Sequence, residues 1–80
     1  MTDLVIQARD GNRPAFEQLI DHYQGDIYRL IYYRIHTRMD AEDLTQDVFV
    51  RAYRNIARIR EPLKFRGWLF RIAINRVNDY

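Results

Sequence analysis

The last third of the chain, from Arg58 to Tyr80, combines cations, aromatic rings and amides in the order RIREPLKFRGWLFRIAINRVNDY. Lys and Arg bind backbone phosphates, aromatic faces stack on unpaired bases, and amides or carboxylates hydrogen-bond to base edges. A surface that carried all three kinds of side chain could hold single-stranded nucleic acid. Whether these residues share a surface depends on their spacing.

A helix from about Phe65 onward would sort this stretch into faces, because an α-helix turns through about 100° per residue. One face of this helix would contain Trp68, Arg71, Asn75 and Asp79. A buried stripe would contain Phe65, Leu69, Ile72, Ala73 and Tyr80, with Phe70, Ile74 and Val77 beside it. The alternative is that Trp68 is a half-buried core ring and that Arg71, Asn75 and Asp79 form an ordinary solvated face.

The charges are distributed unevenly along the chain. Residues 1 to 50 hold five Lys or Arg against nine Asp or Glu, a net charge of −4, and residues 51 to 80 hold eight against two, a net charge of +6. A positive surface attracts phosphate, and an acidic one suits a different partner. Because a run of charges is usually only a solvated face, this asymmetry favours nucleic acid only together with the aromatic and amide residues.

The elements that position these residues are predicted to be helices. With 80 residues, 48% of them hydrophobic, three Gly, two Pro and no Ser or Cys, the chain predicts one all-α domain, a compact bundle of about four helices. Thr2 or Asp3 would cap a first helix that ends at Asp10-Gly11-Asn12, and Asn12 would cap a second that runs to about Thr37.

A third helix is predicted to begin with Asp40 as its N-cap and to end before Arg60 to Lys64, because Pro62 disfavours helical backbone around it. Its core-facing residues would be Leu44, Val48, Ala52 and Ile56, which are spaced by four. The opposite face would present Asp43, Gln46, Asp47, Val50 and Arg54. That acidic, amide-bearing face suits a protein partner.

The sequence offers no constellation for catalysis, and no enzyme activity or cofactor is expected. Without Cys or Ser the usual nucleophiles are missing, and His22 and His36 lie fourteen residues apart with no partner at metal-binding spacing. The acidic residues near Asp43 lack the glycine of a calcium loop. Neither a long apolar run nor a signal peptide is present, so a cytoplasmic protein with no membrane insertion is expected.

Two motifs resemble a known family. AEDLTQDVFVRAYRNI, followed by a short loop and FRGWLFRIAINRVNDY, is similar to region 2 of bacterial sigma-70 family RNA polymerase sigma factors of the extracytoplasmic function (ECF) group. The resemblance covers essentially all 80 residues. It implies a non-enzymatic domain that confers promoter specificity on RNA polymerase and that recognises and melts the minus ten promoter element in transcription initiation.

The resemblance also implies roles for individual residues. The residues expected on the clamp helices of the polymerase beta-prime subunit are Asp43, Gln46, Asp47 and Val50. The loop at about Pro62 to Phe65 would capture a base flipped from the minus ten element, at an unstacking cost of a few kcal/mol. The residues expected along the single-stranded non-template path are Trp68, Arg71, Asn75 and Asp79, with phosphates bound by Arg58, Arg60, Lys64 and Arg66. Asp79 would either accept from an exocyclic amine or pair with Arg76 or with a basic residue beyond Tyr80.

These factors normally carry a second helical domain, region 4, that reads the minus thirty-five element, and this chain shows no counterpart of it. The resemblance therefore implies an isolated or truncated region 2, which an anti-sigma factor could also bind. Two alternatives remain at this stage, a helical protein-interaction domain with an acidic partner and a duplex DNA-binding helix-turn-helix regulator. A preference for single-stranded oligonucleotides that depends on base identity would favour the sigma-factor hypothesis over both, and a preference for duplex would favour the regulator.

Overall fold

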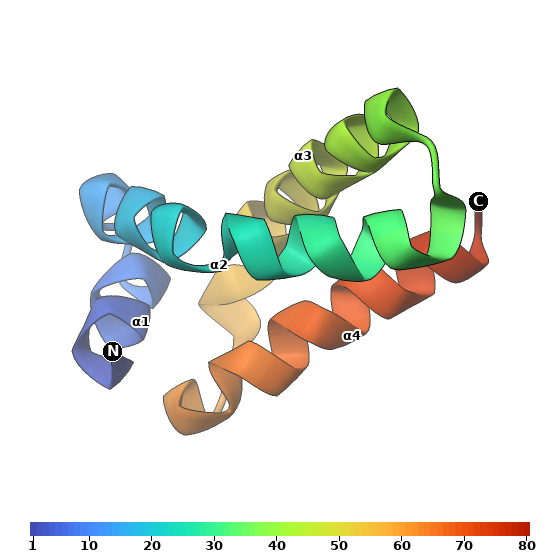
Figure 1. Ribbon diagram of the computed structural model, residues 1–80. Coiled ribbons are helices and arrows are strands. Elements are labelled where there is room, and N and C mark those ends of the chain that lie inside the picture. Colours follow the sequence, from blue (N-terminus) through green and yellow to red (C-terminus); the bar gives the residue numbers. More distant parts are fainter.

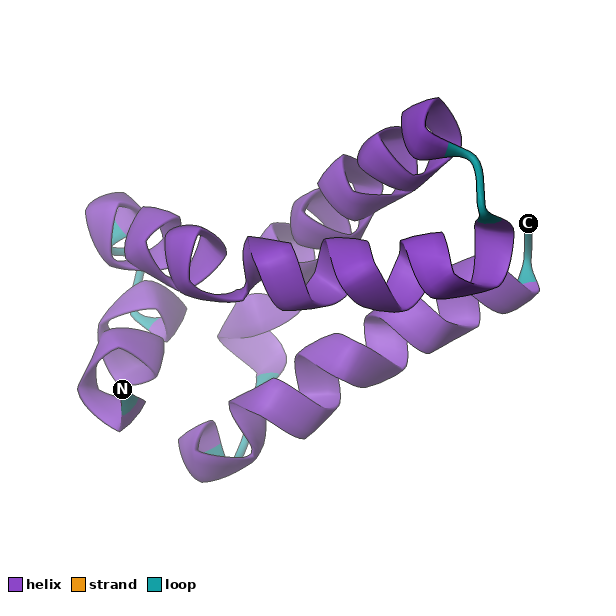
Figure 2. Ribbon diagram, viewed as in Figure 1, coloured by secondary structure: helices purple, strands orange, loops and turns teal.

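The computed structural model describes residues 1–80 and consists of four α-helices joined by short turns (Figures 1 and 2). The helices are α1 (Thr2–Arg9), α2 (Arg13–Ile35), α3 (Arg38–Asn55) and α4 (Phe65–Asn78), with 3-10 turns at Ile56–Arg58 and Pro62–Lys64. This architecture confirms the predicted all-α bundle. None of the helices combines the length and the apolar character that crossing a bilayer requires.

The long helix α2 organises the bundle, because it packs against α1, α3 and α4, and α3 also packs against α4. The molecule measures 35 × 20 × 18 Å, and its two termini lie at opposite ends (Figure 1). The chain between α3 and α4 lies near the end that α1 also occupies, and α1 contacts both 3-10 turns. The two helices with the predicted functional residues are therefore held by a common partner, α2.

Turn chemistry sets the ends of α2. Gly11 adopts a left-handed conformation with φ 103°, and the Asn12 side chain accepts a hydrogen bond from the backbone N–H of Ala15 at 3.0 Å. Pro14 lies in the first turn, where its missing N–H costs nothing. At the other end His36, with φ 64°, closes the helix by donating its N–H to the carbonyl of Tyr32. The predicted cap at Asn12 is confirmed.

Two predicted caps are wrong. α1 begins at Thr2 with Met1 as its N-cap, so neither Thr2 nor Asp3 caps it. α3 begins at Arg38 with Thr37 as its N-cap, three residues earlier than predicted, because the left-handed turn at His36 ends α2 and reverses the chain at once. Asp40 lies instead in the first turn of α3, where its charge still favours the positive end of the helix.

A single core of 18 buried residues joins the four helices. The predicted core-facing residues of α3, namely Leu44, Val48, Ala52 and Ile56, are all buried. Those of α4 are confirmed at Phe65, Leu69 and Ala73, with Ile72 partly buried against them. Hydrophobic spacing in the sequence therefore located both buried stripes, although Ile74, which was predicted to lie beside that of α4, is 37% exposed.

Tyr80 is an exception to the predicted stripe, since its side chain is 64% exposed. α4 ends at Asn78, so Tyr80 lies beyond the last turn and no longer follows the helical repeat. Its hydroxyl donates a hydrogen bond to the Asp40 carboxylate, which raises the pKa of Tyr80. The end of α4 is thereby tied to the beginning of α3.

Candidate nucleic-acid interface and partner face

A hollow of about 570 Å³ lies between the turn region after α3 and the first half of α4. We call it the loop hollow, and its lining residues are Arg58, Ile59, Arg60, Glu61, Lys64, Gly67, Trp68 and Arg71. Glu61 has extended backbone, and Pro62 then starts the 3-10 turn that runs directly into α4. The proline thus separates the end of α3 from α4 and leaves the hollow between them.

Half of the cations that form no ion pair in this molecule line the loop hollow. The chain has 13 Lys and Arg, and seven of them pair with carboxylates. Of the six that do not, four come from a short segment, Arg58, Arg60, Arg66 and Arg71. Lys64 pairs with Glu61 at 3.4 Å. The hollow is therefore positive and available to an anion.

Trp68 forms the aromatic wall of the loop hollow and is only partly buried. Its ring lies 5.7 Å from that of Phe65, and Phe65 in turn lies 5.7 Å from Tyr23 of α2. Phe65 is 2% exposed, so it has no free face for a base, and the prediction that it contacts DNA is wrong. The reason is its position as the first residue of α4, where it anchors that helix on α2.

The other predicted DNA-binding residues lie outside the loop hollow. The Arg66 guanidinium sits 4.3 Å above the ring of Phe70, a cation–π contact on the flank of α4. Asn75 is exposed farther along the helix, and Asp79 follows its end without any ion pair. The fold thus gathers part of the predicted set in the hollow, namely Arg58, Arg60, Lys64, Trp68 and Arg71.

On α3, the predicted partner residues Asp43, Gln46 and Val50 are exposed on the side that borders α2. We call these three residues the partner face. Gln46 and Val50 line a groove of about 440 Å³ between the two helices, and Asp43 lines a neighbouring hollow that also includes Gln46. Val50 is 46% exposed, so the face combines a carboxylate, an amide and an apolar side chain.

Comparison with known proteins decides the family. Residues 19–80 match the family model described as Sigma-70 region 2. The chain belongs to this family. It is 42% identical over 81 residues to the ECF RNA polymerase sigma factor BldN of Streptomyces coelicolor, an alignment that covers 100% of this chain and 31% of BldN. It is also 40% identical over 75 residues to the ECF RNA polymerase sigma factor SigW of Bacillus subtilis, covering 94% of this chain and 40% of SigW.

A third relative is the RNA polymerase sigma-H factor of Pseudomonas aeruginosa, 36% identical over 77 residues that cover 96% of this chain and 40% of that protein. This sigma-70 region 2 domain of the ECF group therefore spans between 31% and 40% of the length of these relatives. The similarity extends through α1, which lies before the family match begins.

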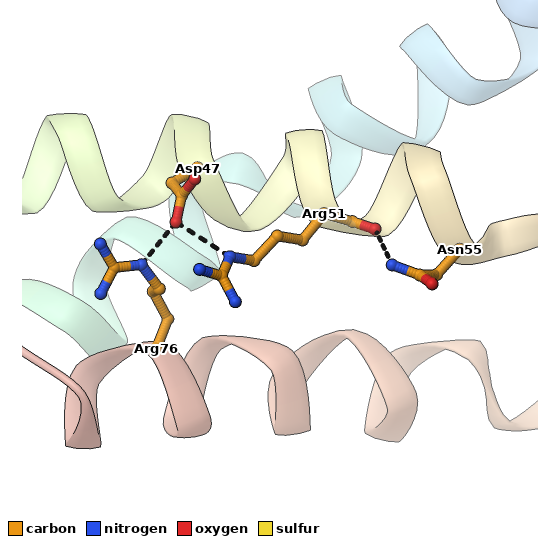
Figure 3. A network of polar contacts seen from close by, with 4 residues as sticks. All are labelled: Asp47, Arg51, Asn55 and Arg76. Carbon is orange, nitrogen blue, oxygen red and sulfur yellow. Dashed lines mark hydrogen bonds and ion pairs between the residues drawn. The ribbon is translucent and has the colours of Figure 1, made fainter.

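In this sigma region 2 domain, Asp47 faces α4 instead of the partner face (Figure 3). Its Oδ2 accepts hydrogen bonds from Arg76 of α4 and from Arg51, the latter at 3.1 Å. The bond from Arg76, together with that from Arg51, holds the pKa of Asp47 below its ordinary value. Arg76 is therefore the partner of Asp47 and forms no pair with Asp79.

Three residues that line the loop hollow were not predicted as site residues from the sequence, namely Ile59, Glu61 and Gly67. Glu61 could have been found as the one carboxylate among the cations of the loop, since a base edge needs an acceptor. Gly67 has open space where a Cβ would lie, so it widens the hollow. No cluster of His, Cys, Asp or Glu in the structure could hold a metal ion.

Proposed function

We propose that this domain confers promoter specificity on RNA polymerase in transcription initiation, by binding the core enzyme and by holding the melted minus ten element. Membership of the sigma-70 region 2 family supports this, as do relatives that are themselves named RNA polymerase sigma factors. The protein would work inside the cell, where the polymerase is. Within that activity α3 and α4 have separate tasks.

The observation that carries the proposal is the group of unpaired arginines around one half-exposed tryptophan. Unpaired guanidinium groups can release counterions from a phosphate backbone, and an indole face can stack on a base that has left the duplex. The hollow beside Trp68 could accommodate such a base, and the Glu61 carboxylate offers a hydrogen-bond acceptor for the edge of the base. The non-template strand would continue along Arg71 and Asn75.

The partner face would dock on the clamp helices of the beta-prime subunit. A carboxylate and an amide suit a basic coiled coil, and an exposed valine adds apolar contact at the centre of such an interface. An anti-sigma factor that covered the same residues would compete with the polymerase. Asp47 lies outside this face, because it points to α4 and is already engaged by two arginines.

Fluorescence anisotropy with short labelled oligonucleotides tests the DNA half of the proposal. The domain should bind single strands more tightly than the corresponding duplex, and affinity should fall between about 50 mM and about 200 mM salt, because each phosphate contact releases a counterion. A preference for duplex would contradict the proposal and favour a helix-turn-helix mode.

Pull-down of core RNA polymerase tests the other half. Gln46→Ala and Asp43→Arg should weaken retention of the polymerase, whereas Gln18→Ala, an exposed glutamine of α2 outside every hollow, should leave it unchanged. Equal retention by all three variants would remove the partner face from the proposal.

A further inference from the structure

A second groove, of about 330 Å³, lies between α3 and α4 on the other side of Trp68. We call it the α3/α4 groove, and its lining residues are Arg51, Asn55, Arg58, Trp68, Ile72 and Asn75. It shares Arg58 and Trp68 with the loop hollow, so the indole stands between the two spaces. Arg51 and Asn55 come from α3, the helix whose proposed task is to bind polymerase.

The side chain of Asn55 is held in one orientation. Its amide donates a hydrogen bond to the backbone carbonyl of Arg51 at 2.8 Å. Because a carbonyl can only accept, the nitrogen of the amide must face it, and the side-chain oxygen must point away. That oxygen has no partner, and Figure 3 shows Asn55 on the side of α3 that faces α4. The groove therefore contains a fixed hydrogen-bond acceptor.

The other side chains of the groove are less selective. The Arg51 guanidinium is engaged by Asp47, while Arg58 forms no ion pair and is free to meet a phosphate. The exposed side chain of Asn75 makes no hydrogen bond, so it can turn its donor or its acceptor to a ligand. Trp68 and Ile72 provide an apolar wall on the α4 side. The groove thus offers a cation, an apolar wall and one acceptor that cannot rotate to become a donor.

We propose that the α3/α4 groove is a second nucleotide subsite, for the neighbour of the base held in the loop hollow, and that it selects a base with an exocyclic amine. The Asn55 oxygen accepts from that amine, Arg58 meets the phosphate between the two nucleotides, and Trp68 separates the two bases. Adenine and cytosine present such a donor, whereas thymine does not. The inference rests on the proposed single-strand binding and adds α3 to the DNA interface.

The test compares two octamers on each protein variant by fluorescence anisotropy. One is built from deoxyadenosine, and the other from deoxynebularine, whose purine lacks only the 6-amino group. The intact chain should bind the first at least about 5-fold more tightly, the effect of one or more hydrogen bonds. Asn55→Ala should lower the ratio of the two affinities about 5-fold, since any contribution of Glu61 in the loop hollow remains. Asn78→Ala, which removes an exposed amide of α4 outside every hollow, should leave that ratio unchanged. Since both octamers are measured on the same variant, any change in the folded fraction cancels.

An affinity ratio that Asn55→Ala leaves unchanged, or equal binding of the two octamers by the intact chain, would overturn the second subsite. The proposed function fails by a different result, namely that Trp68→Ala leaves single-strand affinity unchanged or that neither octamer binds. The two ideas can therefore be rejected separately.

Discussion

Two charged regions of this small domain use their charges in opposite ways. On α3, Arg38 pairs with Glu42 and Arg51 pairs with Asp47, which also binds Arg76 of α4. Around the loop hollow, Arg58, Arg60 and Arg71 pair with nothing. Charges that are neutralised within the molecule orient and stabilise its helices, whereas unpaired ones remain free to bind a partner.

Two carboxylates of α3, Asp43 and Asp47, also differ in whether they form ion pairs. Asp43 and Asp47 lie one turn apart on the same helix, but Asp47 pairs with two arginines, whereas Asp43 forms no ion pair. Asp43 is therefore the better candidate for a partner contact, and Asp47 the better candidate for holding α3 against α4. Substitutions at the two surfaces should have effects that do not spread from one to the other.

The largest expected effect is on single-strand binding. Trp68→Ala should lower the affinity for single-stranded DNA about 30-fold, because one stacked base contributes about 2 kcal/mol. Retention of core polymerase should not change. Tyr33→Ala, which removes an aromatic ring that is 77% exposed at the far end of α2, is the control. An equal loss with both variants would show that Trp68 has no special role.

The next effect concerns the partner face. Asp43→Arg should lower the affinity for core polymerase about tenfold, since a like charge would face a basic partner. Binding of single-stranded DNA should remain the same or rise slightly with the added charge. The matched control is Asp21→Arg, at an exposed and unpaired carboxylate of α2. If core polymerase bound the Asp43 variant as tightly as the control, the proposal that Asp43 contacts the polymerase would be wrong.

Loss of the ion pair between Asp47 of α3 and Arg76 of α4 should have a smaller effect, on the free energy of unfolding. Asp47→Asn should destabilise the fold by about 0.5–1 kcal/mol, because a carboxylate that is 37% exposed is screened by solvent. Urea unfolding would measure it, with Asp21→Asn as the control. A double-mutant cycle with Arg76→Met should show that the two changes are not additive. Additive changes would mean that the ion pair contributes nothing.

The same carboxylate should make stability depend on acid pH. The folded-state pKa of Asp47 lies below its ordinary value of 3.8, so its contribution is complete above that value and is lost as the pH falls through the folded-state pKa. The stability difference between the intact chain and Asp47→Asn should thus be constant near neutral pH and shrink below about pH 4. A difference that did not change in acid would exclude the ionised carboxylate as its source.

The smallest expected effect is at Gly67. Gly67→Ala should stabilise α4 by about 0.5 kcal/mol, because alanine is the better helix former and its Cβ meets no neighbouring atom. The same methyl group narrows the loop hollow, so affinity for single-stranded DNA should fall while thermal stability rises. An increase in both would show that no base enters on that side.

Much of the fold could be predicted from local sequence. The spacing of Leu44, Val48 and Ala52 identified the buried side of α3, and the Asn12 cap with Pro14 located the start of α2. These features depend on neighbours within a few residues, which is why the sequence is sufficient to reveal them. The errors at Asp40 and Tyr80 occurred at helix ends, where one left-handed residue or one early end moves the boundary.

By itself, the sequence determined the helices, their buried stripes and the cation-rich, aromatic character of the last third, because each follows from residue type and periodicity. Only the tertiary structure decided which polar groups meet. It joined Asp47 to Arg76 across 29 residues, buried Phe65 on α2 and placed Asn55 opposite Asn75 across a groove. Such pairings depend on how helices pack, and a helical repeat gives the face of a residue but not the helix that will cover it.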